Sequence, residues 1–599
     1  MDITQSQRSI QIATPLGKDK LLFYRMTGSE RLGALFEYEL ELLGTDSDID
    51  PEKLLGQNVT IRMELADGGW RYFNGYVSRF GHYGTLDYLA LYRASVRPWL
   101  WFLTCNADCR IFQNQTIPDI VKEIFRIHGY SEFEERLSEA YKPREYCVQY
   151  RETDFNFISR LLEEEGIGYY FRHEDGNHTL VLTDSVHAHT PFEGCPEIPF
   201  IHPGNIEHYK QDHIDEWSFA QEVQPGTYEA TNYDFTKPRA DLRAKSMVQR
   251  SHPHAKFAVF DYPGPHLQTD HGESYTRRRI EEHHARFEQS TGQGNARGLA
   301  CGYRFTLVGY PREDQNREYL ITATRFHLSS NEYLSGMAGT PEEFACRFSA
   351  LEAKTVFRPQ RLAPKPVVQG PQTAVVVGKA GEEIWTDEHG QVKVKFHWDR
   401  YGKKDENASC WVRVSHPWAG QGWGAISIPR IGQEVIVDFL EGDPDRPIIT
   451  GRVYNADTRA PFALPGAAVI SGIKSNTHKG KGYNEISMDD TAGKEKFLIH
   501  SQYDMTTTVR NNDHQHVMVD RTIHVDGKHT ETIKKDLHLT VAEGNQVNIV
   551  ESGHLHIQAA QTITLKVGGS SLQMDKDGNI SVNGVYLKLV GSGKIDLNP

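Results

Sequence analysis

The sequence predicts a mainly β protein in three parts: a mixed α+β N-terminal region, a small closed β-barrel and a C-terminal shaft of repeated strands. Short alternating runs separated by Gly-rich turns dominate the first 370 residues. A compact set of strand-like runs fills residues 372–454, and apolar residues recur at a fixed interval after residue 508. Alternation with a period of two indicates strands, and a fixed repeat indicates a stacked array.

The N-terminal region is predicted to contain short strands and a few helices. The clearest helix spans residues 117–128, because Thr116 is a suitable cap, Pro118 suits a first turn and an apolar face precedes Gly129. A second helix is expected over residues 154–165, ending at Gly166, and a charged helix near residues 273–288. The predicted hairpins turn at residues 67–69 and 175–177.

The next part is predicted to be a barrel with flanking linkers. Residues 357–371 carry four prolines, which oppose regular structure and mark a domain boundary. Five or six short strands between residues 372 and 454 suit a closed barrel of the oligonucleotide/oligosaccharide-binding (OB) type. A linker rich in Pro, Ala and Gly follows. The predicted domains are therefore residues 1–370, the barrel at 371–455, the linker at 456–483 and the shaft at 484–599.

The shaft is predicted from a repeat of eight residues. A second apolar column lies two residues before the main one but is broken by Gln515 and Glu531. One octad is too short to close a coil, so either one chain winds through three sides or three chains each supply a strand per layer. A single chain would make fewer than three coils, which favours three chains in a rod about 34 Å long at about 4.8 Å per strand. The main column, which is the predicted β-helix core, comprises Val509, Val517, Val525, Ile533, Val541, Ile549, Ile557 and Leu565.

Composition excludes several classes of function. The net charge of −14 argues against a general nucleic-acid role. No run of eighteen apolar residues predicts a membrane span, and the polar N-terminus does not resemble a signal peptide. Seven scattered cysteines fit a reducing compartment. We therefore expect synthesis in the cytoplasm and, if the protein leaves the cell, export without a cleavable signal.

A search for chemistry finds no strong motif. There is no HExxH, P-loop, G-x-S-x-G or CxxC pattern, so no catalytic residue, cofactor or metal ligand is predicted. Histidines near residues 173–178, and the pairs His187/His189 and His252/His254, are expected on loop surfaces. The pairs His514/His516 and His554/His556 have the parity opposite to the apolar columns and should face water. Glu531 has inward parity, so its strand either bends outward or forms a wet or ion-filled layer.

Three stretches of the sequence resemble the VgrG family of type VI secretion spike proteins. In the barrel these are EIWTD at residues 383–387, together with VKVKFHWDR at 392–400, and IPRIGQEVIVDFLEGDPDRP at 428–447. In the N-terminal region the matching stretch is FNFISRLLEEEG at residues 155–166. The resemblance covers essentially the whole chain. It implies a homotrimer with a phage-tail-hub-like domain, an OB-fold barrel and a triple-stranded β-helix needle.

The resemblance also implies a function and partners. A membrane-puncturing spike of this family caps a tube of Hcp hexamers, carries a PAAR-domain protein at its tip and delivers effectors with adaptors into target cells, so it is secreted after assembly in the cytoplasm. The sequence looks like the form without a fused effector domain, and no enzyme activity is expected, although a fused cell-wall hydrolase is the competing hypothesis. A spike of a phage tail or of an extracellular contractile injection particle is the alternative. By position alone, the PAAR contact is placed on Lys594, Ile595, Asp596, Leu597, Asn598 and Pro599.

Overall fold

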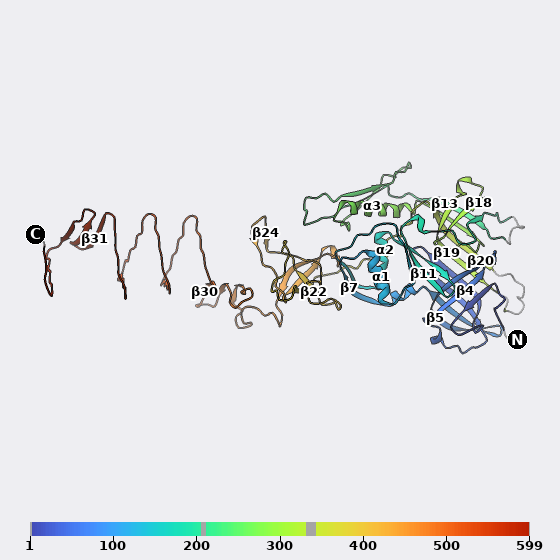
Figure 1. Cartoon of the computed structure of the whole chain (residues 1–599), viewed down its shortest axis with the longest axis horizontal. Coiled ribbons are helices and arrows are strands. Elements are labelled where there is room, and N and C mark those ends of the chain that lie inside the picture. Colours follow the sequence, from blue (N-terminus) through green and yellow to red (C-terminus); the bar gives the residue numbers. More distant parts are fainter. Residues whose placement is uncertain (1–2, 205–210, 331–332, 334–342, 598–599) are drawn as a thin grey trace. The chain divides into compact units, whose positions relative to one another are not determined.

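The computed structural model describes residues 3–204, 211–330, 333 and 343–597. It divides into two compact units, residues 1–504 and 505–599 (Figure 1). The first unit holds the N-terminal hub, the barrel and a small three-stranded sheet. The second unit is the shaft. Among the described residues, no helix combines the length and the apolar composition that crossing a membrane would need.

The hub is built on a twelve-stranded sheet that joins the two ends of the N-terminal region. Its main path runs in the order β1-β4-β5-β6-β3-β2-β19-β20-β17-β13, so β2 near the N-terminus pairs with β19, almost 300 residues later in the chain. All neighbours along this path are antiparallel. The strands are β1 (Ile10–Ala13), β2 (Leu22–Arg31), β3 (Glu37–Gly44), β4 (Asn58–Glu64), β5 (Trp70–Leu86), β6 (Leu89–Arg97), β12 (Glu197–Pro199), β13 (Ile214–Gln221), β17 (Glu288–Gly294), β18 (Arg304–Val308), β19 (Glu318–Ser329) and β20 (Glu343–Glu352).

Aromatic rings pack tightly at the β2–β19 junction. Gly28 lies opposite both Phe326 and Tyr38 in the strand register. A Cβ atom on Gly28 would lie 2.2 Å from the Phe326 ring, so the glycine leaves the space that this ring occupies. Phe326 in turn lies 5.0 Å from Phe73, measured between ring centroids. Gly28 therefore serves packing across the sheet.

Two helices and two smaller sheets complete this part of the hub. Helix α1 (Ile117–Ile127) has Thr116 as its cap, and helix α2 (Asp154–Glu165) ends at Gly166 in the left-handed conformation. The structure confirms both predicted helices. The sequence could predict them because a cap or terminator residue acts only on nearby backbone groups. The remaining strands are β7 (Ala107–Phe112), which pairs with β9 (Cys147–Thr153), and β8 (Phe133–Arg136), β10 (Gly168–Glu174) and β11 (Asn177–Thr183).

A third helix, α3 (Thr269–His284), covers a three-stranded sheet of β14 (Thr227–Ala230), β15 (Ala244–Met247) and β16 (Ala258–Asp261). The helix begins and ends four residues earlier than the predicted range. Its cap, Gln268, makes no side-chain hydrogen bond, so the N-terminus carries no capping signal in the sequence. At the other end, the chain enters strand β17 at Glu288, and this pairing fixes where the helix must stop.

The barrel sheet has the order β22-β21-β26-β27-β23. Its core includes Tyr146 and Val148 from the hub, so the apolar interior runs across the predicted domain boundary. Strand β25 does not join this sheet and pairs with β24 in a separate two-stranded hairpin. The strands are β21 (Gln372–Val377), β22 (Lys393–Phe396), β23 (Arg413–Val414), β24 (Trp418–Ala419), β25 (Gly424–Ala425), β26 (Glu434–Phe439) and β27 (Pro447–Val453).

A three-stranded antiparallel sheet follows the barrel: β28 (Ile470–Lys474), β29 (Glu485–Asp489) and β30 (Lys496–His500). Strand β28 lies inside the segment predicted as a linker. Its register aligns Ile473 with Ile486, and Ile486 with Ile499. All three of these side chains are exposed in the single chain. One face of this sheet is therefore apolar and uncovered.

Candidate functional site

The shaft is the feature that the single chain leaves incomplete. None of residues 505–597 is buried, although the octad columns are apolar. Val525 and Val541 in the main column are 46% and 45% exposed. A soluble segment of this size normally buries an apolar core, because that burial must offset the conformational entropy of an ordered chain. The apolar columns therefore require a surface from outside the chain.

The shaft backbone leads to the same conclusion. No strand pairing is found between residues 501 and 561, and the chain runs back and forth in extended legs (Figure 1). Extended backbone carries one donor and one acceptor per residue, and these groups must be paired once an assembly buries them. Widely separated legs cannot pair with each other. Strands of other copies, lying between the legs, would supply these partners.

The end of the shaft differs from the simple octad. Strands β31 (Thr562–Val567), β32 (Ser570–Asp575) and β33 (Ile580–Asn583) form an antiparallel sheet within one chain. Leu565 lies opposite Leu572, and Leu572 lies opposite Val582, so apolar residues meet across the three strands. The turn at Gly568 and Gly569 joins β31 directly to its antiparallel neighbour β32, whereas the legs before β31 are not paired with one another.

The terminal residues proposed for cap binding are only partly described. Lys594, Ile595, Asp596 and Leu597 are exposed, and Lys594 Nζ lies 2.7 Å from Asp596 Oδ1. Asn598 and Pro599 lie outside the described residues.

The hub is joined to the barrel by polar contacts. The backbone N–H of Val148 donates to Asp445 Oδ1 at 2.6 Å, and Lys365 Nζ lies 2.8 Å from Asp443 and 3.0 Å from Asp445. Together with the shared apolar core, these contacts fix the barrel to strand β9 of the hub. The proline-rich segment is therefore held at a rigid junction.

Asp108 forms a second link across this junction. Its carboxylate accepts hydrogen bonds from Tyr401 Oη and Arg400 Nη2, both at 2.7 Å, and pairs with Arg110 at 2.9 Å. Burial alone would raise the pKa of Asp108, but these donors and the nearby guanidinium groups lower it to about 2. Asp108 therefore stays ionised and holds the barrel loop at residues 400–401.

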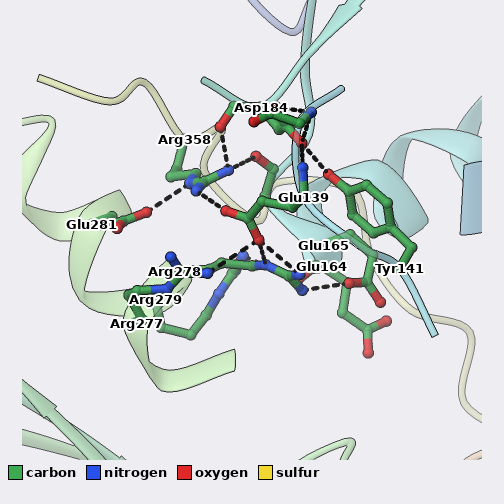
Figure 2. A network of polar contacts seen from close by, with 12 residues as sticks. Glu139, Tyr141, Glu164, Glu165, Asp184, Arg277, Arg278, Arg279, Glu281 and Arg358 are labelled. Atoms are coloured by element: carbon green, nitrogen blue, oxygen red, sulfur yellow. Dashed lines mark hydrogen bonds and ion pairs between the residues drawn. The ribbon is translucent and has the colours of Figure 1, made fainter. Parts of the chain in front are cut away.

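A network around Glu139 ties three parts of the hub together (Figure 2). Arg358, which is 3% exposed, donates to Glu139 at 2.6 Å and to Glu281 of α3 at 2.8 Å. Arg278 of α3 also donates to Glu139 and pairs with Glu165 of α2. Burial would raise the pKa of Glu139, but Arg358 and Arg278 bring it below its usual value. The network fixes the segment leading to the barrel against α2 and α3.

Two hub histidines that were expected on the surface are buried. His178 and His189 are only 1% and 2% exposed, so their expected surface position is wrong. His178 Nδ1 lies 2.7 Å from the Asn74 side chain, and His189 Nδ1 lies 2.8 Å from a backbone carbonyl. Burial lowers the pKa of His189 to about 4. His178 lies in β11 and His189 follows a 3-10 turn, and the partners that bury them, Asn74 and Gly302, are more than 100 residues away in the sequence. The local sequence therefore does not show that these rings are buried.

A groove of about 810 Å³ lies on the hub sheet. Its lining includes Trp217, Arg325 and Arg347, which come from β13, β19 and β20. The lining contains no histidine or cysteine, so it offers no nucleophile–base pair of the usual kind.

Four of the five barrel tryptophans, which adjoin many acidic residues in the sequence, form two groups of two, and the fifth, Trp398, stacks on Phe396. Trp385 and Trp411 stack with a centroid distance of 6.4 Å. Trp418 and Trp423 form an exposed pair on the β24–β25 hairpin. The two groups are not one continuous stacking platform for single-stranded nucleic acid.

Three family models match the chain in the order of its parts. A phage tail baseplate hub model matches residues 29–332. A type VI secretion system/phage-baseplate injector OB domain matches residues 374–454. A bacteriophage T4 gp5 C-terminal trimerisation domain matches residues 471–582, which includes the β28–β30 sheet and most of the shaft.

Curated relatives share high identity. The chain is 44% identical to the type VI secretion system spike protein VgrG1a of Pseudomonas aeruginosa, covering 99% of this chain and 95% of the relative. It is 47% identical to VgrG1b of the same organism, covering 88% and 71%. The actin cross-linking toxin VgrG1 of Vibrio cholerae is 32% identical over 89% of this chain but extends well beyond it, since the match covers 48% of that protein.

Solved structures agree on the fold. The c3393 protein of Escherichia coli, a type VI secretion component similar to the phage tail proteins gp27 and gp5, matches with a TM-score of 0.53 at 21% identity. That match covers 74% of this chain and 100% of the other. A Francisella PdpA–VgrG complex matches 96% of this chain and 87% of its own with a TM-score of 0.52 at 9% identity.

Proposed function

The chain belongs to the VgrG family of type VI secretion spike proteins, and we propose that three copies of it form a puncturing spike that delivers effector proteins into target cells. The observation that carries the proposal is the shaft with no core of its own. An ordered chain with uncovered apolar columns and unpaired legs gains a core and strand partners when copies wind together. The match of residues 471–582 to a trimerisation domain supports three as the number.

The spike function makes a mechanical demand on the chain. A protein driven through a membrane must resist unfolding, and strands paired between chains leave no free lateral edge along the rod. The junction contacts of Asp108 and of Arg358 support this function, because they connect the barrel and its leading segment firmly to the hub. Force applied to the hub would then pass to the barrel without bending a flexible linker.

We further propose the partners that the family resemblance implies. The hub would sit on a tube of Hcp hexamers. A PAAR-domain protein would cap the end formed by Lys594 to Pro599, and effectors with adaptors would be carried on the assembly. The protein would act without catalysis of its own, after assembly in the cytoplasm and secretion from the cell.

The proposal is tested in the protein's own bacterium by deleting its gene and measuring Hcp in the culture medium. Loss of Hcp secretion, with recovery on expression of the wild-type chain, is the expected result. Undiminished secretion would contradict the proposal if no second spike gene is present. Turnover of peptidoglycan by the purified chain would instead favour an enzyme.

A further inference from the structure

Histidines are concentrated on one part of the shaft. Seven of the 28 histidines lie between residues 514 and 556, although this stretch is only 43 residues long. In the described single chain, no group of three His, Cys, Asp or Glu residues is close enough to hold a metal ion. The single chain, however, lacks the neighbouring strands of the assembly. The question is which histidines become neighbours once three copies wind together.

The octad repeat answers this question geometrically. In a three-chain prism, each octad of one copy moves to the next face and rises by one strand spacing, about 4.8 Å. The three-fold axis then places the preceding octad of another copy directly below it. Residues eight apart in the sequence therefore lie side by side on adjacent strands of different copies. His516 and His524 are eight apart, so they become cross-strand neighbours.

A third histidine lies on the same outer face. His514 and His516 are two residues apart, so both side chains point the same way from one strand. Their Cα atoms are about 6.6 Å apart along the strand. Their parity is opposite to that of Val517 in the apolar column, so they face outward. His524 has the same parity and its side chain is 85% exposed in the single chain. The three imidazoles would form a triangle across the boundary between two copies.

This arrangement matches a known ligand set. Three histidines, with a fourth position left to water, hold Zn²⁺ at about 2.0–2.1 Å in catalytic sites. Imidazole also suits Cu²⁺ and Ni²⁺. His524 has a further property of a ligand, because its Nε2 lies 3.0 Å from Asp526 Oδ1. A carboxylate on one ring nitrogen orients a histidine and raises its basicity toward a metal on the other.

We propose that the assembled shaft binds divalent transition-metal ions at three equivalent outer sites, each made by His514 and His516 of one copy and His524 of a neighbour. The inference rests on the proposed three-copy shaft. Because each ion would join two copies, it binds the assembled state alone and stabilises it by linkage. The sites would clamp the copies together at the beginning of the shaft.

A second histidine pair in the shaft provides the contrast. His554 and His556 form an equivalent pair, but the positions eight residues before and after His556 are Asn548 and Thr564. Neither side chain is a ligand of comparable strength for zinc. This second pair therefore lacks a cross-strand histidine and serves as an internal control.

The experiment uses the full chain without an affinity tag, stripped of metal. Native mass spectrometry first establishes the trimer, and the proposed function fails if only monomer is found. Zn²⁺ is then added to the trimer, and bound metal is measured by equilibrium dialysis. We expect three ions per trimer whose binding weakens at least about tenfold in His524→Asn, since one of three protein ligands is lost.

Two further variants make the test specific. Asp526→Asn should weaken zinc binding by about 10- to 100-fold, as removal of an orienting carboxylate does. His554→Asn should leave the three tight sites unchanged. A trimer that binds fewer than three ions, that binds equally well as His524→Asn, or that loses the same sites in His554→Asn would overturn the proposal while leaving the spike function intact.

Discussion

Replacement of Ile549 by aspartate should prevent assembly of the shaft. In the single chain Ile549 is 76% exposed, so about three quarters of its surface remains to be covered by other copies. Full burial of such a side chain contributes about 1.5–3 kcal/mol, which gives about 1–2 kcal/mol per copy and about 3–7 kcal/mol for three. The dissociation constant would rise by about two to five powers of ten from this loss alone. The three inward carboxylates at one level add a desolvation cost of several kcal/mol each to the free energy of assembly.

The assay is sedimentation or native mass at micromolar protein, with Val550→Asp as the matched control. Val550 directly follows Ile549, so its side chain points to the opposite face of the strand. The equivalent position three octads earlier is Asp526, so the repeat already has an aspartate at this position. We expect Ile549→Asp to be monomeric and Val550→Asp to remain trimeric. The hub fold should survive in both, as judged by its thermal transition. If Ile549→Asp assembles normally, or if Val550→Asp dissociates equally, the inward column is wrongly assigned.

Three other predictions concern the hub and its junction. Arg358→Leu removes a buried partner of Glu139 and Glu281, and should lower hub stability by about 3–5 kcal/mol, seen as a lower Tm by calorimetry. The folded-state pKa of Asp108 is depressed to about 2, so its contribution is present above pH about 4 and is lost as pH falls toward 2. Asp108→Asn should therefore flatten the fall of stability between pH 4 and 2, and an unchanged slope would contradict the role of this carboxylate. Gly28→Ala should destabilise by about 1–3 kcal/mol, because the new Cβ would clash with the Phe326 ring, whereas equal urea midpoints for variant and wild type would mean that the ring moves freely.

Local signals in the sequence predicted local structure well. The cap Thr116 and the terminator Gly166 act only on nearby backbone groups, so α1 begins and α2 ends close to the predicted residues. The start of α3 was missed because Gln268 makes no capping contact. The pairing of β2 with β19 could not be predicted, because a strand does not carry the identity of a partner almost 300 residues away.

The family could be identified from the sequence by the resemblance of the barrel and hub motifs. The repeat could be identified independently, because an apolar step of eight residues predicts a strand, a turn and an inward face whatever surrounds them. Tertiary structure was needed to find the cross-links of the hub. Residues such as Arg358, Glu139 and Asp108 have no motif, and their importance comes from burial beside charges contributed by distant segments. Tertiary structure also decided that the barrel shares its core with β9 of the hub. The sequence determines which faces of its strands and helices are apolar. Only the folded chain determines which of these faces pack against each other. The apolar columns of the shaft stay uncovered in the single chain, and they are the faces available to other copies.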